Sequence, residues 1–186
     1  MRRRFTRLAA AVLCISALAA LAQVHRRDPL TPPETDALRE ASMEPDKKLP
    51  LYLKYARARL AAIEQVRSDP HSAGERGRQI HDLLADFKVI MDEMDRNVDS
   101  FANQKLDFRK ALREIVRTDG EFQAALGKLK DAAKDPAVAA EAKDYEFALL
   151  DAIEAVDGDL DNAKDLLEQQ EKAAAEAKAK AKEKKK

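Results

Sequence analysis

The stretch IHDLLADFKVIMDEMDRNVDSF, residues 80–101, carries the most regular pattern in this chain of 186 residues. Its apolar residues alternate spacings of four and three, as the a and d positions of a heptad repeat do, and most residues between them are charged or polar. A helix with this pattern has one apolar face, which must be buried against other helices. The residues on this apolar stripe are Ile80, Leu84, Phe87, Met91, Met94, Val98 and Phe101.

The heptad phase continues past residue 101 without a skip, and two interpretations compete. One is a single helix of about 55 residues, counted along the unbroken heptad phase. The other is a hairpin of two antiparallel helices that turn at Asn103-Gln104-Lys105, with Asn103 as a left-handed cap and Asp107 capping the second helix. The charge of Lys105 on the stripe favours the hairpin, and the absence of Gly or Pro nearby favours the single helix. We favour the hairpin. The later stripe positions are Lys105, Phe108, Leu112, Ile115, Asp119, Phe122, Leu126 and Leu129.

Asp119 is an acidic residue on this otherwise apolar stripe. A buried acid of this kind can enforce one particular packing arrangement or bind a ligand. More often such a residue lies at the edge of the stripe and reaches water, and that is the position we expect for Asp119.

Two further segments show helical periodicity. The first has Leu49, Leu53, Ala56, Leu60 and Ile63 on one face, with Asp46 as a cap, and ends before Pro70, which disfavours helical geometry in the preceding residue. The second is a last long helix that begins with Asp135 as N-cap and Pro136 in its first turn. Its apolar side comprises Val138, Ala142, Tyr145, Leu149, Ile153, Val156, Leu160, Ala163 and Leu167.

These segments predict an all-α fold, an antiparallel bundle of about four long helices with coiled-coil-like heptads, over residues 46–170. The chain has only five glycines and no tryptophan, and helix-forming residue types dominate. Residues 23–45 hold four prolines and predict a flexible leader, in which a short helix over 34–42 would fit. Residues 171–186 are a Lys/Ala-rich charged tail.

The chain opens with a basic segment, Arg2, Arg3, Arg4 and Arg7, followed by an apolar run to Ala22. A basic start, an apolar run and small residues at the end predict a secretory signal peptide, residues 1–22, cleaved after Ala22. The run has about 15 residues, whereas about 20 are needed to span a bilayer, so an uncleaved membrane anchor is the less favoured alternative. Cys14 is the only cysteine and would leave with the signal, so the mature protein would hold no disulfide.

The formal net charge of zero hides an uneven distribution of charge. Without residues 1–22, 30 basic residues stand against 34 acidic ones, and the last sixteen residues hold seven lysines and three glutamates. Residues 23–170 therefore carry a net charge of −8 and the tail +4. No basic face with interleaved aromatic residues occurs, so nucleic acid is not an expected partner. We expect the tail to interact through Lys178, Lys180, Lys182, Lys184, Lys185 and Lys186.

The stretch DGDLDNAKDLLE, residues 157–168, places acids at the first, third, fifth, ninth and twelfth positions, as an EF-hand calcium loop does. However, the sixth position, where such a loop needs glycine for its sharp turn, is Asn162. The apolar side of the preceding helix also continues in phase through this stretch. We therefore predict a helix, and only a weak metal site. Its candidate ligands are Asp157, Asp159, Asp161, Asp165 and Glu168.

Other site chemistry has little support. None of the three histidines has a glutamate three residues before it, which excludes the Glu-x-x-His pairs of di-iron bundles. A haem held by His81 and a methionine is disfavoured because Met91 and Met94 lie on the apolar stripe of the same helix. No Ser-His-Asp order, Gly-rich phosphate loop or H-E-x-x-H motif appears.

The segment KLPLYLKYARARL, residues 48–60, and the helical body around it resemble a group of exported bacterial helical proteins that have no assigned function. The resemblance covers most of the mature chain, implies export and an all-α fold, and brings no catalytic residues.

We therefore expect a non-enzymatic exported protein of the periplasm or exterior, without a cofactor, that acts as a structural or protein-interaction component of the bacterial cell envelope. Its expected partner is an envelope protein or an anionic envelope surface, and the heptads would also suit a homo-oligomer. A small helical periplasmic chaperone and a ligand- or metal-binding helical bundle are the alternatives.

Overall fold

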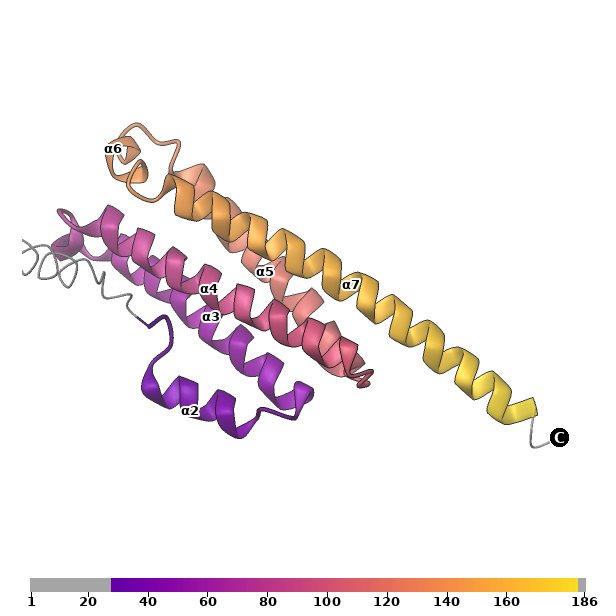
Figure 1. Ribbon diagram of the computed structural model, residues 1–186. Helices are drawn as coiled ribbons and strands as arrows, with labels where there is room; N and C mark the ends of the chain where they lie inside the picture. Colours follow the sequence, from indigo (N-terminus) through magenta and orange to yellow (C-terminus); the bar gives the residue numbers. More distant parts are fainter. Residues whose placement is uncertain (1–27, 184–186) are drawn as a thin grey trace, which may run out of the picture.

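A computed structural model describes residues 28–183 of the chain (Figure 1). The predicted signal peptide and Lys184, Lys185 and Lys186 lie outside these residues. Within 28–183 the chain is all-helical, without a strand, and no helix in that range combines the length and apolar character needed to cross a membrane. The helices are α2 (Pro32–Glu40), α3 (Pro45–Ser68), α4 (Arg76–Asn103), α5 (Arg109–Ala132), α6 (Ala139–Ala142) and α7 (Glu146–Glu183), with a 3-10 turn, η1, at Pro70–Ser72.

The four long helices pack in a closed order that differs from their order in the chain. α3 lies along α4 and α5, and α7 lies along the other sides of α4 and α5. The successive helices α4 and α5 are therefore diagonal to each other, and their side chains meet in the middle. There the rings of Phe87 and Phe122 lie 5.3 Å apart in an edge-to-face arrangement, a geometry that aromatic pairs favour.

The apolar stripe predicted from residue 80 onward forms the centre of the core. Each of its apolar members on α4 and α5, together with Phe108 just before α5, is at most 3% exposed. Burial of a side chain of this size contributes about 1.5–3 kcal/mol before the entropy of ordering is subtracted. These two helices therefore form the centre of the core, which buried residues of α3 and α7 complete.

The chain turns between α4 and α5, so the hairpin interpretation is confirmed over the single long helix. The residue with left-handed geometry is Lys105, with φ of 57°, rather than the predicted Asn103. Asp107 accepts a hydrogen bond from the Arg109 amide at 3.4 Å, while Asp46 of α3 accepts one from the Ala111 amide at 3.2 Å. A free amide at the start of α5 is thus satisfied by a side chain from another helix.

The described part of the predicted leader, residues 28–45, is held against α3. α2 begins with a capping box, in which the Thr31 amide donates to Glu34 at 2.8 Å. Arg59 of α3 then binds both oxygens of Glu34, at 2.9 and 2.7 Å, and the Pro29 carbonyl at 2.6 Å. The Arg59 hydrogen bond is the main cause that lowers the pKa of Glu34 to about 2. With Leu38 buried as well, this segment is part of the packed body.

The predicted last helix is interrupted, and its first part is the separate short helix α6. Asp135 caps the turn by accepting a hydrogen bond from the Ala137 amide at 2.9 Å, but the helix does not continue into α7. Instead α6 packs against the start of α4. A Cβ atom placed on Gly77 would lie 2.8 Å from the Glu141 carbonyl oxygen and 2.6 Å from an Asp144 carboxylate oxygen. Only glycine lets the two backbones approach this closely.

We expect Gly77→Ala to lower the free energy of unfolding by about 1–2 kcal/mol, because the clash outweighs the gain in helix propensity. Gly127→Ala is the matched control, since a Cβ atom at Gly127 on α5 meets nothing within 4 Å. That variant should gain about 0.5–1 kcal/mol. Urea denaturation measures both changes. Equal gains in the two variants would contradict the close approach of α6 to α4.

Candidate functional site

The five acidic residues considered as calcium ligands lie along α7 and do not converge. Asp157, Asp161, Asp165 and Glu168 follow one exposed face, whereas Asp159 points the opposite way and is 8% exposed. Within the described range, no group of three or more His, Cys, Asp or Glu side chains is placed to hold a metal ion. The stretch is continuous helix, as predicted.

The expectation that Asp119 reaches water is wrong. Its side chain is 0% exposed, and neither carboxylate oxygen has a hydrogen-bond partner. Burial without a partner disfavours the ionised carboxylate and raises the pKa of Asp119 to about 7. The sequence pattern identified Asp119 as unusual but gave no means to determine its depth.

A second buried acid, Asp159 of α7, lies near the surface between α4 and α7. One of its carboxylate oxygens, Oδ2, is buried without a partner. Burial is the main cause that raises the pKa of Asp159 to about 9, and the charges of Asp95, Asp119, Asp92 and Asp99 raise it further. At neutral pH the Asp159 carboxyl is therefore protonated.

A shallow hollow of about 510 Å³ lies over Asp159. It is lined by four acidic residues and one arginine, and within it Asn162 donates to Asp95 at 2.8 Å. Asp92 is already paired with Lys88 at 2.6 Å. The chemical property that Asp119 and Asp159 share is that burial favours the protonated form of each carboxyl. The residues that line the hollow are Asp92, Asp95, Arg96, Glu154, Ala155, Gly158, Asp159 and Asn162.

The raised pKa values of Asp119 and Asp159 predict how the stability of the protein depends on pH. Their pKa values in the folded protein, about 7 for Asp119 and about 9 for Asp159, exceed the ordinary value of 3.8 for an aspartate. Between about pH 4 and these values the folded state holds more protons than the unfolded state, so stability falls as pH rises. The free energy of unfolding should fall by up to about 1.4 kcal/mol per pH unit for each carboxyl, more steeply from pH 5 to 7 than from 7 to 9.

Asp119→Asn should flatten the slope between pH 5 and 7, as measured by urea denaturation at several pH values. Asp157→Asn, which changes an exposed carboxylate on the outer face of α7, is the control and should keep the wild-type slope. Glu34 acts outside this window, because its lowered pKa contributes stability that is lost only as pH falls below about 4. A slope that Asp119→Asn leaves unchanged would show that Asp119 does not bind the proton.

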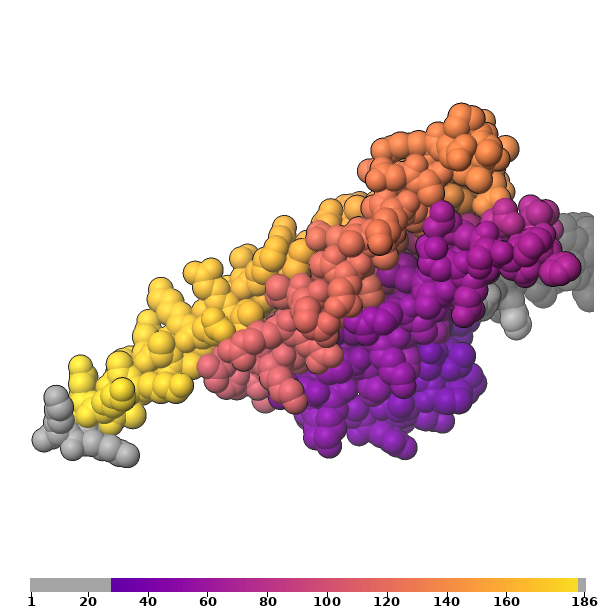
Figure 2. Space-filling model, turned by 180° about the vertical axis from the view of Figure 1, so that it is seen from behind, coloured from indigo at the N-terminus to yellow at the C-terminus, as the bar shows by residue number. Residues whose placement is uncertain are grey.

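The lysine-rich tail continues α7 as helix to Glu183, so α7 has 38 residues. Near the α4–α5 connection it still contacts the body: Gln170 donates to the Leu106 carbonyl at 3.1 Å, and Glu171 pairs with Arg113 of α5 at 2.8 Å. Beyond them the helix extends past the other helices (Figures 1 and 2). Lys178, Lys180 and Lys182 are exposed and make no ion pair with any described residue.

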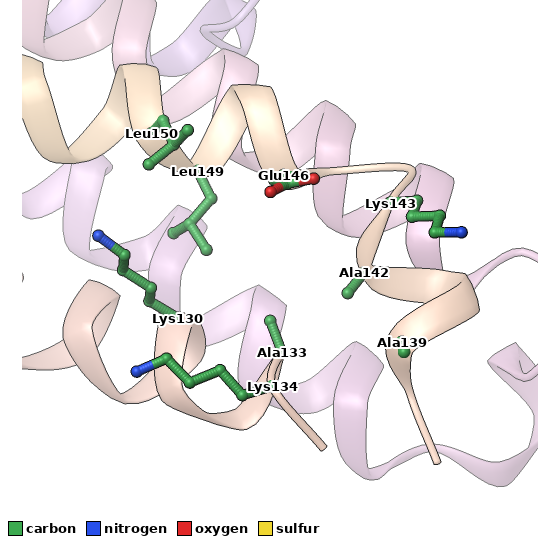
Figure 3. Close-up of a pocket in the computed structure, with 9 residues that line it drawn as sticks. All are labelled: Lys130, Ala133, Lys134, Ala139, Ala142, Lys143, Glu146, Leu149 and Leu150. Atoms are coloured by element: carbon green, nitrogen blue, oxygen red, sulfur yellow. The ribbon is translucent and has the colours of Figure 1, made fainter. Parts of the chain in front are cut away.

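A second hollow, of about 330 Å³, lies where the end of α5, α6 and the start of α7 meet (Figure 3). Its interior is apolar, and four charged side chains surround it. No sequence pattern indicates this hollow, because it exists only where the predicted last helix breaks. Its lining residues are Lys130, Ala133, Lys134, Ala139, Ala142, Lys143, Glu146, Leu149 and Leu150.

The remaining polar residues of interest are used within the fold. His81 lies on the exposed side of α4 beside Asp82, at 3.2 Å, away from the buried Met91 and Met94. Tyr52 is buried, with its hydroxyl donating to Glu93 at 3.0 Å. The Tyr52–Glu93 hydrogen bond joins α3 to α4, and among the described residues His81 does not face Met91 or Met94.

Comparison of the chain with protein-family models, with curated proteins and with solved structures found no match. The function must therefore be argued from the residues and the geometry of the molecule itself.

Proposed function

We propose that this chain is a non-enzymatic, exported component of the bacterial cell envelope that binds an anionic membrane surface through the end of α7. The helical body serves as a rigid platform, and the basic end of α7 makes the contact. The observation that carries the proposal is the extension of a lysine-bearing helix beyond every other described helix, with Lys178, Lys180 and Lys182 unpaired with any described residue.

The fold we propose for the platform is an antiparallel four-helix bundle. α3, α4, α7 and α5 neighbour one another in a closed order, and the short connections between α3 and α4 and between α4 and α5 favour reversal of chain direction. Such a platform would hold the base of the α7 extension in a fixed direction.

The composition of the extension determines how it would bind. Apart from its charged residues it contains only alanine after Glu171, so it lacks the large apolar side chains with which amphipathic helices insert into a bilayer. Attraction would come from lysines near a negative lipid surface, about 1 kcal/mol for each. Binding of this kind is superficial and weakens with salt.

Export is supported by the basic and apolar N-terminal segment and by the resemblance of residues 48–60 to exported helical proteins. Together these support a location where an envelope membrane is accessible. The proposal needs no cofactor and no reaction.

The chaperone alternative has less support from the surface. The large hydrophobic residues exposed among the described residues are Met43, Val89, Phe147 and Leu150. Met43 and Val89 lie on different elements from Phe147 and Leu150, and of the four only Leu150 lines one of the hollows described above. Ligand binding by the bundle has a specific observation in its favour, the hollow beside α6.

Co-sedimentation with lipid vesicles tests the membrane proposal. We expect the protein to bind vesicles that contain anionic lipid, to ignore zwitterionic vesicles, and to lose most binding between 50 and 500 mM salt. A chain that ends at Ala175 should lose binding by at least tenfold, because it lacks six of the seven tail lysines. It keeps Gln170 and Glu171, so the body should unfold at an unchanged temperature.

A matched variant separates charge from helix length. Replacing Lys178, Lys180 and Lys182 by glutamine keeps the extension but removes three positive charges. This variant should bind more weakly than the full chain but more tightly than the form that ends at Ala175. Equal binding by the full chain and the form that ends at Ala175 would overturn the proposal. Binding that persists in high salt would do so as well.

A further inference from the structure

We propose that the hollow between α5, α6 and α7 binds a small amphipathic carboxylate, a fatty acid of about eight carbons. Its acyl chain would lie against the alanines and leucines, and its carboxylate beside Lys130 and Lys134. This site lies at the end of the body opposite the α7 extension (Figure 1) and is independent of the membrane proposal.

The hollow is built into the fold, because α6 is fixed in place. The Gly77 backbone lies against the Glu141 carbonyl, and Arg76 pairs with Glu141 at 3.3 Å through side chains that are about one-fifth exposed. These contacts hold α6 against α4, so that the space beside α7 is left open. A preformed space of about 330 Å³ lies at the lower end of the range for ligand pockets, about 300–1,000 Å³.

The interior suits an acyl chain. In Figure 3 the side chains of Ala133, Ala142 and Leu149 surround the space, and alanine is too short to fill it. Protein interiors otherwise pack without such gaps. Leu149 is buried, whereas Leu150 on the wall is 43% exposed and Phe147, three residues earlier on the same face of α7, is 78% exposed. The apolar surface therefore continues from the interior to the outside.

The charged residues around the hollow indicate which charge a ligand would carry and which way it would lie. Lys130 and Lys134 extend along one edge, Lys143 points away at the opposite side, and Glu146 is the only acid in the lining (Figure 3). The lining is thus positive overall, on a body whose residues 23–170 carry −8. Lys130 has no ion pair with any described residue, and Lys134 shares only an exposed pair with Asp131. Glu146 would repel a carboxylate, so the head group is directed to the Lys130 edge.

A titration of the full chain with octanoate, followed by NMR of the backbone amides, tests the proposal. Octanoate stays below its micelle concentration throughout. We expect saturable shifts confined to residues 129–150, apart from any shifts in the lysine tail. Hexanoate should bind about sixteenfold more weakly, since each buried methylene is worth about fourfold in affinity. Octanol should bind more weakly than octanoate, and octylammonium should cause no saturable shift at the hollow.

Two pairs of variants locate the site. Ala139→Leu places a larger side chain in the hollow and should abolish binding, while Ala140→Leu, the exposed neighbour that does not line it, should bind as the wild type does. Lys130→Gln combined with Lys134→Gln should weaken octanoate binding about threefold to tenfold but leave octanol binding unchanged. Lys128→Gln is the control for that pair, because Lys128 is exposed outside the lining.

Several results would overturn the assignment. One is the absence of saturable shifts near residues 129–150 in a protein that is folded by circular dichroism. Another is octanol or octylammonium binding as tightly as octanoate, which would show that the lysines do not select the ligand. A third is equal binding by Ala139→Leu and Ala140→Leu.

Discussion

The fold depends on one requirement, the burial of two apolar stripes carried by consecutive helices. α4 and α5 cannot satisfy this requirement by lying side by side, because each stripe is wide enough to contact two neighbours. They lie diagonally instead, with Phe87 against Phe122 at the centre, and α3 and α7 fill the remaining two positions. Other features, such as the capping of α5 by Asp46 and the docking of α2 on α3, follow from that arrangement.

Asp119 and Asp159 are buried acids that lie against this apolar interior with unpartnered carboxylate oxygens. Two carboxyls with unpartnered oxygens lower stability, and similar apolar side chains would pack there without that penalty. Protonation reduces the cost, since a neutral carboxyl needs far less solvation than an ion. The molecule thus tolerates the pair by keeping Asp159 uncharged at neutral pH, and its stability becomes coupled to pH.

Charge is segregated along the length of the molecule. Acids dominate the surface between α4 and α7, lysines occupy the free end of α7, and a smaller group of lysines surrounds the hollow beside α6. Like charges gathered in this way attract different partners to different places. The two ends of the molecule therefore suit two different ligands, a membrane surface at the free end of α7 and a small anion at the hollow beside α6.

The sequence alone determined that the chain is helical, which face of α4 and α5 is buried, and that residues 157–168 continue a helix. Spacing along the chain records these properties because they depend on neighbours three and four residues away. Only the tertiary structure decided the diagonal placement of α4 and α5, the docking of residues 28–45, the break between α6 and α7, and the depth of Asp119. Each of these depends on contacts between residues that are distant in the sequence, such as Gly77 with Glu141 or Arg59 with Glu34. The hollow beside α6 belongs to this second group, because local periodicity carries no information about the space between helices.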